Sequence, residues 1–392
     1  MRGKPVAVGG GIEKGSVVAA ASYEAKAFGI KSGMATWDAK KLCPNLIIII
    51  GDMTKYAYTS KIIFKMLRDY TDLVEIFSID EAFMDITETM ERWGGESELA
   101  RDIKKRIKGK FGLTCSIGIG PNKLMAKFAG ELQKPDGLVI LRPDDIPEKI
   151  KDVAVKELCG VGRKIEKYLA ELGVKTFGDL NKYPREKLVK RFGIAYGEQL
   201  WQMGQGKGSD NVKPYYYEVP AKSMGHSYTL PKAAYDLVEV KSYLLRLSEQ
   251  VGRRLRSENY KGNIVHVSLS SADFKYWGKQ KKIEDYINDG YRIYKTGEKL
   301  IDDHMRNVGT GLACLPARQV TVRFVGVSLS GLIQNKDQIS IFESDEKGKM
   351  ALKSMDEINN RFGEFTIERA AIMETVLRGK TGMVSSRNYK TQ

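Results

Sequence analysis

The decapeptide Phe77–Ile86 constrains this chain more than any other segment. It places two adjacent carboxylates, Asp80 and Glu81, between two apolar runs of strand character. A strand sends successive side chains to opposite faces, whereas at the tip of a hairpin both carboxylates can converge on one point. Convergent carboxylates repel each other unless a divalent cation lies between them, which suits phosphoryl transfer assisted by metal ions. From these residues alone, a solvated acidic turn explains the pair equally well.

Length and composition narrow the class of protein. A chain of 392 residues is too long for one core and should divide into two to four domains. The net charge of +15 favours polyanionic partners, although a merely basic protein is the alternative. The scattered cysteines suggest neither a zinc ribbon nor a disulfide framework, and the scattered histidines argue against a histidine metal site. Without a long apolar run or a signal peptide, we expect no membrane contact and a cytoplasmic, nucleoid-associated protein.

Periodicity predicts an α+β arrangement around the acidic hairpin. Thr54 is the expected N-cap of a helix whose apolar residues recur at helical spacing through Tyr70. Ser78 is interpreted mainly as part of a strand. Strands are also expected over 6–8, 114–119 and 138–141. Helices are expected over 123–132 and in a segment marked by Leu99, Ile103 and Ile107. Near the C-terminus, strands over 223–228, 265–269 and 320–324 and helices over 240–255 and 350–362 are expected.

Several ordered motifs resemble one enzyme family. They are Arg2–Gly10, Val17–Met34, the hexapeptide Ser78–Phe83, Cys115–Lys127 and Lys134–Gly137. Together they resemble the Y-family, the lesion-bypass DNA polymerases. The resemblance implies a multidomain α+β fold, a right-hand polymerase whose palm has an antiparallel sheet plus helices. The implied domains are a partial palm (1–9), fingers (10–69), palm (70–150), helical thumb (151–204), linker (205–213), α+β little finger (214–333) and a C-terminal segment (334–392).

The resemblance also assigns roles around the acidic pair. Asp80 and Glu81 become the catalytic carboxylates, which bind two Mg²⁺ ions in the complete site. Tyr23, Lys26 and Lys134 become the residues that hold the triphosphate of an incoming deoxynucleotide. The family usually has Arg where Lys26 stands, and Lys keeps the charge but lacks the planar fork that grips phosphate oxygens in pairs.

One departure from the family lies at the start of the sequence. The family has a short first strand before its Arg-Gly-Lys-Pro segment, and that strand carries another metal-binding Asp and the aromatic residue that excludes ribonucleotides. Here Met1 directly precedes Arg2. A site without that carboxylate should bind its metals weakly. Because Asp80 and Glu81 are intact, we expect truncation of an active enzyme rather than a lineage specialised for binding.

Two regions are expected to contact DNA. Leu158–Ile165 has a helix–hairpin–helix pattern, in which Gly160 and Gly162 bring backbone N–H groups near a phosphate. Arg163 and Lys164 supply positive charge, and such a loop reads the DNA backbone and not the bases. The second region is the basic stretch 241–282, where the candidates are Arg253, Arg254, Arg256 and Lys261. A plain helical turn and a solvated helix face are the respective alternatives.

The segment Gln338–Phe342 is similar to the peptide by which bacterial polymerases dock on the sliding clamp. Gln338 would form hydrogen bonds while Ile341 and Phe342 enter a groove, although an ordinary strand is the alternative. The expected protein is a monomeric, error-prone translesion DNA polymerase with primer-template DNA, deoxynucleotides and a clamp as partners. The alternatives are an impaired homologue that only binds damaged DNA and the clamp, and another metal-dependent phosphotransferase, against which the fingers, thumb and basic region argue.

Overall fold

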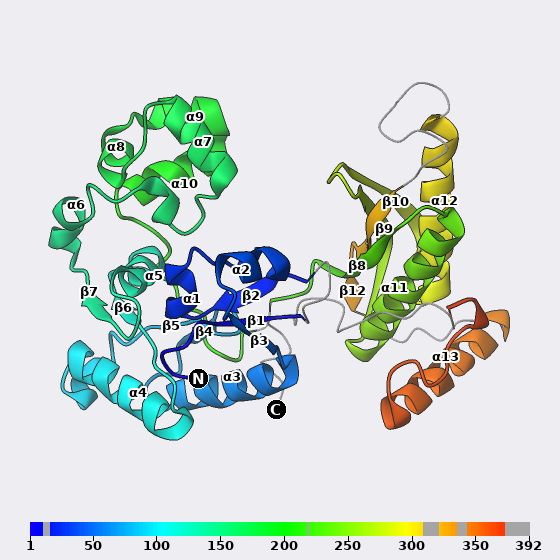
Figure 1. Ribbon diagram of the computed structural model, residues 1–392, viewed down its shortest axis with the longest axis horizontal. Coiled ribbons are helices and arrows are strands. Elements are labelled where there is room, and N and C mark those ends of the chain that lie inside the picture. The colour runs from blue at the N-terminus through cyan, green and yellow to red at the C-terminus, as the bar shows by residue number, and fades with distance from the viewer. Residues whose placement is uncertain (11–15, 218, 309–320, 335–342, 373–392) are drawn as a thin grey trace. The chain divides into compact units, whose positions relative to one another are not determined.

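The computed structural model describes residues 1–10, 16–217, 219–308, 321–334 and 343–372. They form two compact units (Figure 1). The first unit combines 1–51 with the described residues from 219 onward, and the second unit comprises 52–217. Within the described residues, no helix is both long and apolar enough to cross a bilayer.

The second unit begins with a capped helix and the predicted hairpin. Helix α3 (Met53–Leu67) is capped by Asp52, whose Oδ1 accepts hydrogen bonds from the N–H groups of Thr54 (3.0 Å) and Lys55 (3.1 Å). The prediction of Thr54 as the N-cap was therefore wrong, because the carboxylate two residues earlier already satisfies the first free N–H groups. Strands β4 (Val74–Ile76) and β5 (Ala82–Met84) pair antiparallel, which confirms the hairpin.

Helix α4 (Glu96–Phe111) completes the core beneath that hairpin. Its buried residues Leu99, Ile103 and Ile107 join those of α3 and Val74 in one apolar cluster. The predicted helical face of this segment is confirmed. The short 3₁₀ helix η1 (Met90–Trp93) connects the hairpin to α4.

Helix α5 (Lys123–Leu132) covers a parallel strand pair, β6 (Ile117–Ile119) and β7 (Leu138–Ile140). The helix has the predicted bounds, and both strands lie within their predicted ranges. The approach is so close that a Cβ on Gly118 would lie 2.1 Å from the carbonyl oxygen of Ala126. Only glycine therefore allows α5 to lie on β6 at this distance.

A helical module follows in the same unit. It contains η2 (Pro143–Asp145), α6 (Ile146–Lys149), η3 (Val155–Glu157), α7 (Arg163–Glu171), α8 (Phe177–Lys182), α9 (Arg185–Phe192) and α10 (Ile194–Gly204). Leu169, Leu180, Leu188 and Leu200 are fully buried where these helices meet. Thr176 and Asp179 form a reciprocal capping box at the start of α8.

The N-terminal part of the first unit is a small mixed sheet with the order β2-β1-β3. Strand β1 (Val6–Gly9) pairs antiparallel with β2 (Val18–Ala21) and parallel with β3 (Ile47–Ile50). Helices α1 (Tyr23–Ala27) and α2 (Thr36–Leu42) bury Ala25 and Ala39 in the same core. The expected strand over 6–8 is thus confirmed.

The C-terminal part of the first unit contains a larger antiparallel sheet with the order β10-β9-β11-β8. Its strands are β8 (Ser223–Ala234), β9 (Tyr260–Ser271), β10 (Tyr276–Ile287) and β11 (Val322–Ser330), and the short β12 (Ile333–Gln334) also pairs with β9. Helices α11 (Leu237–Ser257) and α12 (Gly290–Val308) lie together on one face of the sheet (Figure 1). Helix α13 (Glu343–Phe362) and η4 (Ala370–Ile372) follow. Val320, predicted to begin a strand, lies outside the described residues.

Candidate active site and nucleic-acid interface

The turn that carries Asp80 and Glu81 is held by its backbone and by α3. The N–H groups of Phe77 and Ser78 both donate to the carbonyl of Glu81, at 3.0 and 3.1 Å. The hydroxyl of Ser60 on α3 donates to the carbonyl of Ile79. These bonds join the turn to a long helix, so the two carboxylates are presented by a fixed support.

Two neighbouring side chains orient the carboxylates. The Ser78 hydroxyl donates to Oδ1 of Asp80 at 2.6 Å, and the Lys127 ammonium on α5 forms an ion pair with Glu81. Ser78 lies in the turn and not in β4, which ends at Ile76, so its interpretation as a strand residue was wrong. Lys127 was missed as a site residue, although it stands four residues after Lys123 on the same face of a helix.

Glu75 on β4 connects the hairpin to two other segments. Its Oε2 accepts a hydrogen bond from Nζ of Lys123 at 2.9 Å and another from the backbone N–H of Lys213 at 3.0 Å. Burial opposes ionisation, but the Lys123 ammonium and the Lys213 N–H outweigh it and lower the pKa of Glu75. The carboxylate is therefore ionised and connects the acidic hairpin, α5 and the chain that follows α10.

The loop that carries Lys134 is supported by a lysine from α4. Nζ of Lys104 donates to the carbonyls of Cys115 (2.8 Å), Asp136 (2.7 Å) and Gly137 (3.2 Å), and to Oδ1 of Asp136 (2.6 Å). The hydrogen bond from Lys104 lowers the pKa of the Asp136 carboxyl. Lys134 itself is half-exposed and pairs with Glu131 at 2.5 Å.

Tyr23 and Lys26 lie together on α1 of the first unit. The Lys26 ammonium is 4.7 Å from the centre of the Tyr23 ring, and 49% of the tyrosine is exposed. Ser22 caps this helix by accepting a hydrogen bond from the N–H of Ala25. The pair therefore offers a cation and a phenol to solvent from one short helix.

The glycine turn before α7 has the geometry that the sequence predicts. Gly160 has a φ of +104°, a conformation that favours glycine, and its carbonyl accepts a hydrogen bond from the Tyr196 hydroxyl at 2.8 Å. Gly162 is the N-cap of α7, and no side chain caps the first turn. Arg163 and Lys164 are exposed there. The free N–H groups and the helix dipole make this end a suitable place for a phosphate.

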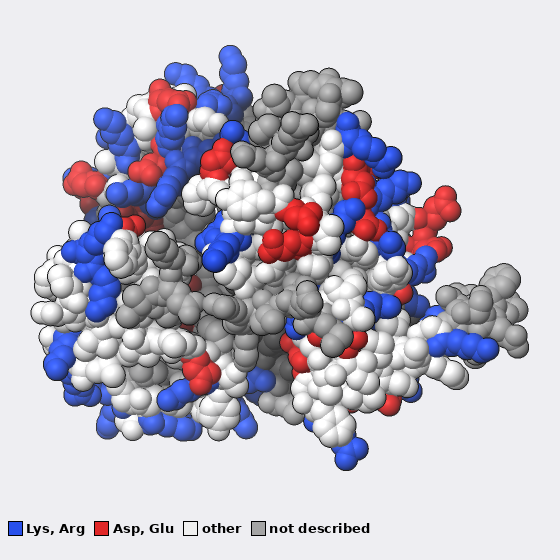
Figure 2. All heavy atoms as spheres, turned by 45° about the vertical axis from the view of Figure 1, so that its right-hand side comes forward, with Lys and Arg blue, Asp and Glu red and all other residues white. Residues whose placement is uncertain are grey.

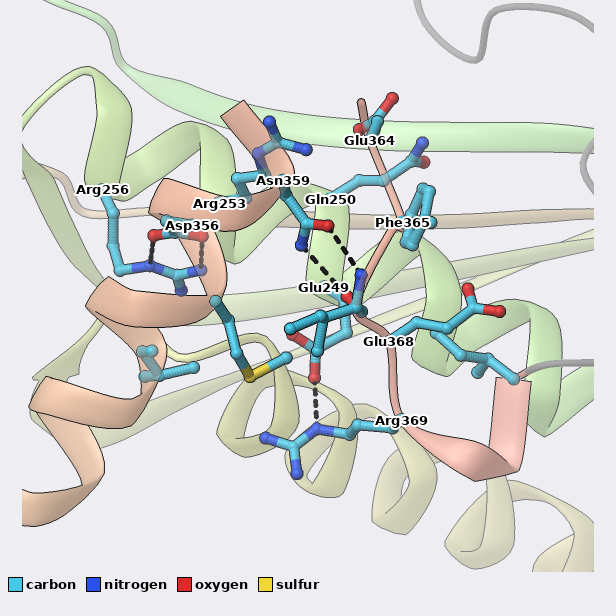
Figure 3. A pocket seen from close by; sticks show the side chains of 14 residues that line it. Glu249, Gln250, Arg253, Arg256, Asp356, Asn359, Glu364, Phe365, Glu368 and Arg369 are labelled. Atoms are coloured by element: carbon cyan, nitrogen blue, oxygen red, sulfur yellow. Dashed lines mark hydrogen bonds and ion pairs between the residues drawn. The ribbon is translucent and has the colours of Figure 1, made fainter. Parts of the chain in front are cut away.

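The three candidate arginines of α11 have partners within the chain, and Figure 3 shows one such pair, Arg256 with Asp356. Arg256 forms a forked pair with Asp356 of α13, at 2.6 and 2.8 Å, and also donates to the carbonyl of Asn288. Arg253 donates to Asn360 Oδ1 at 2.8 Å, and Arg254 pairs with Glu258 at 2.9 Å. With only 16% of its side chain exposed, Arg256 connects two helices.

Glu249 lines a small pocket beside these arginines, beneath α13 (Figure 3). It pairs with Arg369 at 2.6 Å, while burial raises the pKa of its carboxyl. Lys261, the fourth candidate, is half-buried on β9 opposite Ile333 of β12. The contacts of α11 with α13 and with the segment after α13 therefore form a packed interface within the first unit.

Exposed lysines gather on the edge strand β10. Lys279, Lys281 and Lys282 are exposed on it, and β9 is its sheet neighbour. Lys and Arg side chains are spread widely over the face in Figure 2, and acidic side chains gather at a few places among them. An edge strand presents unpaired backbone groups beside its side chains, so this strand offers both N–H donors and cations to an anionic partner.

Gln338, Ile341 and Phe342 lie outside the described residues. Among the residues that the structure does describe, no group of three or more His, Cys, Asp or Glu side chains is arranged to hold a metal ion.

Comparison with known proteins agrees with this architecture. Residues 1–131 match the impB/mucB/samB family, and residues 221–341 match the C-terminal domain of the same family. Residues 156–208 match the thumb domain of DNA polymerase-iota. The three matches cover the acidic hairpin, the glycine turn and the larger sheet in order.

Individual relatives match along nearly the whole chain. The chain is 38% identical to a DNA polymerase IV of Pelotomaculum thermopropionicum, over 97% of its own length and 93% of the relative. It is 38% identical to a DNA polymerase IV of Moorella thermoacetica, over 94% and 90%. Among solved structures, a Y-family DNA polymerase chimera of Dbh and Dpo4 matches with a TM-score of 0.73 and 29% identity, over 85% of this chain and 93% of that one. An insertion ternary complex of Dbh DNA polymerase matches with a TM-score of 0.54 and 28% identity, over the same shares.

An acidic hairpin on an α+β support is followed by a helical module with a glycine turn before α7, and this order matches the palm and thumb of right-hand DNA polymerases. The chain belongs to the Y-family of DNA polymerases, among the relatives called DNA polymerase IV.

Proposed function

We propose that this chain is a template-directed DNA polymerase of the translesion type, which extends a primer opposite damaged bases. The observation that carries the proposal is the Asp80–Glu81 turn, fixed by Ser60, Ser78 and Lys127 within a chain similar to DNA polymerase IV. The reaction joins the primer 3′-hydroxyl to the α-phosphate of a deoxynucleoside triphosphate and releases pyrophosphate.

The carboxylate pair fits a divalent cation of the Mg²⁺ type. Hard carboxylate oxygens suit this ion, which commonly keeps several waters and takes one or two carboxylates together with substrate phosphates. Asp80 and Glu81 would therefore hold two Mg²⁺ ions jointly with the triphosphate. When bound, the ions supply charge stabilisation for the attacking and leaving oxygens. Ser78 fixes Oδ1 of Asp80, and Lys127 balances the charge of Glu81 before the ions bind.

Tyr23, Lys26 and Lys134 are the proposed triphosphate ligands. The two lysines supply positive charge, and the phenol of Tyr23 can donate to a phosphate oxygen. Lys104 holds the loop two residues beyond Lys134, at Asp136, and a loop that is held in advance loses less entropy when its cation binds a phosphate.

Replacing Lys104 by Met should raise the KM for deoxynucleotides roughly tenfold, because three carbonyls and a carboxylate would lose their donor and the loop of Lys134 would lose its support. Steady-state primer extension measures KM and kcat separately, and the DNA Kd should stay unchanged. Lys105→Met, an exposed substitution on the same helix, is the matched control. Equal KM values for the two variants would contradict the supporting role of Lys104.

The glycine turn before α7 and the edge strand β10 are the proposed DNA contacts. Both offer backbone N–H groups beside cations, and neither presents an arrangement that reads bases. Arg253, Arg254, Arg256 and Lys261 would contribute to the field around the DNA, and the three arginines also have direct partners within the protein.

A sliding clamp is a further proposed partner. The proposal is supported only by the sequence of the segment Gln338–Phe342. A polymerase with a loose grip on DNA gains from a tether that raises its effective concentration at the primer end. The chain would act as a monomer at that clamp.

Primer extension on a defined template tests the proposed function. With Mg²⁺ and single deoxynucleotides, the protein should add the nucleotide complementary to the template base. It should do so on an undamaged template and on a template in which an abasic site lies next to that base. Chelation of the metal should abolish extension, since the carboxylates alone supply no positive charge. Addition that ignores the template base, or that persists in a chelator, would contradict the proposal.

A further inference from the structure

Helix α5 contacts the acidic hairpin through two lysines that stand four residues apart. Lys123 pairs with Glu75 of β4 at 2.9 Å, and Lys127 pairs with Glu81 of the turn. Residues at this spacing lie on one face of a helix, so a single helix supplies both cations. The exposed fraction is 19% for the Lys123 side chain and 21% for the Lys127 side chain, and both ion pairs are therefore partly shielded from water.

The Lys127 ammonium is held by an aromatic ring as well as by a carboxylate. It lies 5.1 Å from the centre of the Phe77 ring, and that ring packs edge to face on Phe83 with the ring centres 5.4 Å apart. The electrons of an aromatic ring attract a cation placed over its face. Helix α5 itself is fixed by its Asn122 cap and by its close contact with Gly118 of β6. The fold therefore sets the position of this cation.

The two carboxylates of the turn have different partners. Oδ1 of Asp80 accepts a hydrogen bond from the neutral Ser78 hydroxyl at 2.6 Å, whereas Glu81 pairs with a cation. In the part of the chain that the structure describes, no lysine or arginine forms an ion pair with Asp80. The positive charge that belongs to the turn is therefore placed on one carboxylate, Glu81.

We propose that Lys127 is a positioning residue that acts as an internal counter-ion of Glu81 and lowers the affinity of the acidic pair for divalent cations in the absence of a nucleotide. The inference rests on the proposed function, in which Asp80 and Glu81 hold Mg²⁺ jointly with the triphosphate. Two carboxylates and one ammonium leave the turn with a single net negative charge, whereas the carboxylates alone would carry two. The phosphates of the nucleotide then supply the further negative charge that a divalent cation needs.

Two physical effects give the direction of this role. An ammonium that is paired with Glu81 competes with any other cation for the same oxygens, and like charges that share one carboxylate also repel each other. In a partly exposed site, a unit charge at such close range changes the binding constant of a divalent ion roughly tenfold. Lys127 acts on the cation through Glu81, because its own ammonium has no lone pair with which to bind a metal.

Binding of Mn²⁺ to the intact protein measures this role without DNA or nucleotide. Mn²⁺ takes the same oxygen ligands as Mg²⁺, and electron paramagnetic resonance reports the concentration of free Mn²⁺ during a titration. Lys127→Met keeps an aliphatic chain over Phe77 but removes the charge, so its hairpin should bind Mn²⁺ roughly tenfold more tightly than the unchanged protein. Lys127→Arg keeps the charge and should restore the Mn²⁺ affinity of the unchanged protein.

Three further variants make the titration specific to the hairpin. Asp80→Ala should lose this Mn²⁺ site, so its titration gives the binding by all other acidic side chains. Lys123→Met is the matched control on the same helix face: its cation pairs with Glu75, so the Mn²⁺ affinity should change by less than about threefold. Lys127→Gln also removes the charge and should bind Mn²⁺ as tightly as Lys127→Met. Melting curves show which of these variants fold.

The outcomes separate the role of Lys127 from the proposed function. An Mn²⁺ affinity of the folded neutral variants that is equal to or weaker than that of the unchanged protein would overturn the counter-ion role. Equal tightening in Lys123→Met would overturn the assignment to Lys127. Primer extension by the unchanged protein is measured beside these titrations. If it failed while Lys127→Met still bound Mn²⁺ more tightly, the proposed function would be wrong and the counter-ion role would stand.

Discussion

Asp80→Ala should lower the rate of template-directed primer extension by roughly 100- to 1000-fold, the range lost when one preorganised charge-stabilising group is removed. Asp80 stands at the tip of the hairpin, where Ser78 fixes one of its oxygens, so its loss removes half of the carboxylate pair. The affinity for DNA should be unchanged, because the cationic surfaces lie on other elements. Single-turnover extension and a binding titration on the same duplex measure the two quantities.

Glu88→Ala is a suitable control, since it removes an exposed acid just beyond the same hairpin. It should extend primers at the unchanged rate. Glu81→Ala should lose activity in the same way as Asp80→Ala, and it should also leave Lys127 without its ion-pair partner. Extension by Asp80→Ala at the rate of the Glu88→Ala control would remove the central assignment of this site.

The parts of the fold that were predictable are those that local sequence determines. The acidic hairpin follows from two short apolar runs around a polar pair, and it forms between β4 and β5. Helix α5 has the predicted bounds because Asn122 caps its first turn from within the same peptide. The N-cap of α3 was predicted wrongly because Asp52 and Thr54 are both residue types that cap helices well. In the structure it is the Asp52 carboxylate that accepts the hydrogen bonds of the first turn.

The side chains that support the site could not be predicted in this way. Lys127 meets Glu81 across 46 residues of sequence, and Lys104 meets Asp136 across 32. Arg256 meets Asp356 across 100 residues, so its place in a basic stretch suggested a free cation. Such partners are fixed by how elements fold against each other, which hydrophobic periodicity does not encode.

DNA affinity should fall by roughly three decades between 50 and 200 mM salt if about six phosphates are neutralised, because each neutralised phosphate releases condensed counterions. The expectation follows from the cations at the start of α7 and on β10, both of which face solvent beside backbone donors. Affinities for unrelated duplex sequences should be equal within a few fold, since backbone contacts carry no sequence information. Fluorescence anisotropy across a salt series measures both.

Charge reversals separate the surfaces that bind DNA from the cations that hold the protein together. Lys164→Glu and Lys281→Glu should each weaken binding to all sequences and reduce the steepness of the salt dependence by about one unit in the log–log slope. Arg256→Ala should keep that slope and instead lower the melting temperature by several degrees, because Asp356 would lose its forked partner between α11 and α13. If Arg256→Ala changed the slope of the salt dependence and Lys281→Glu did not, the DNA contact would lie on α11 and not on β10. That outcome would agree with the original prediction from the basic stretch of the sequence.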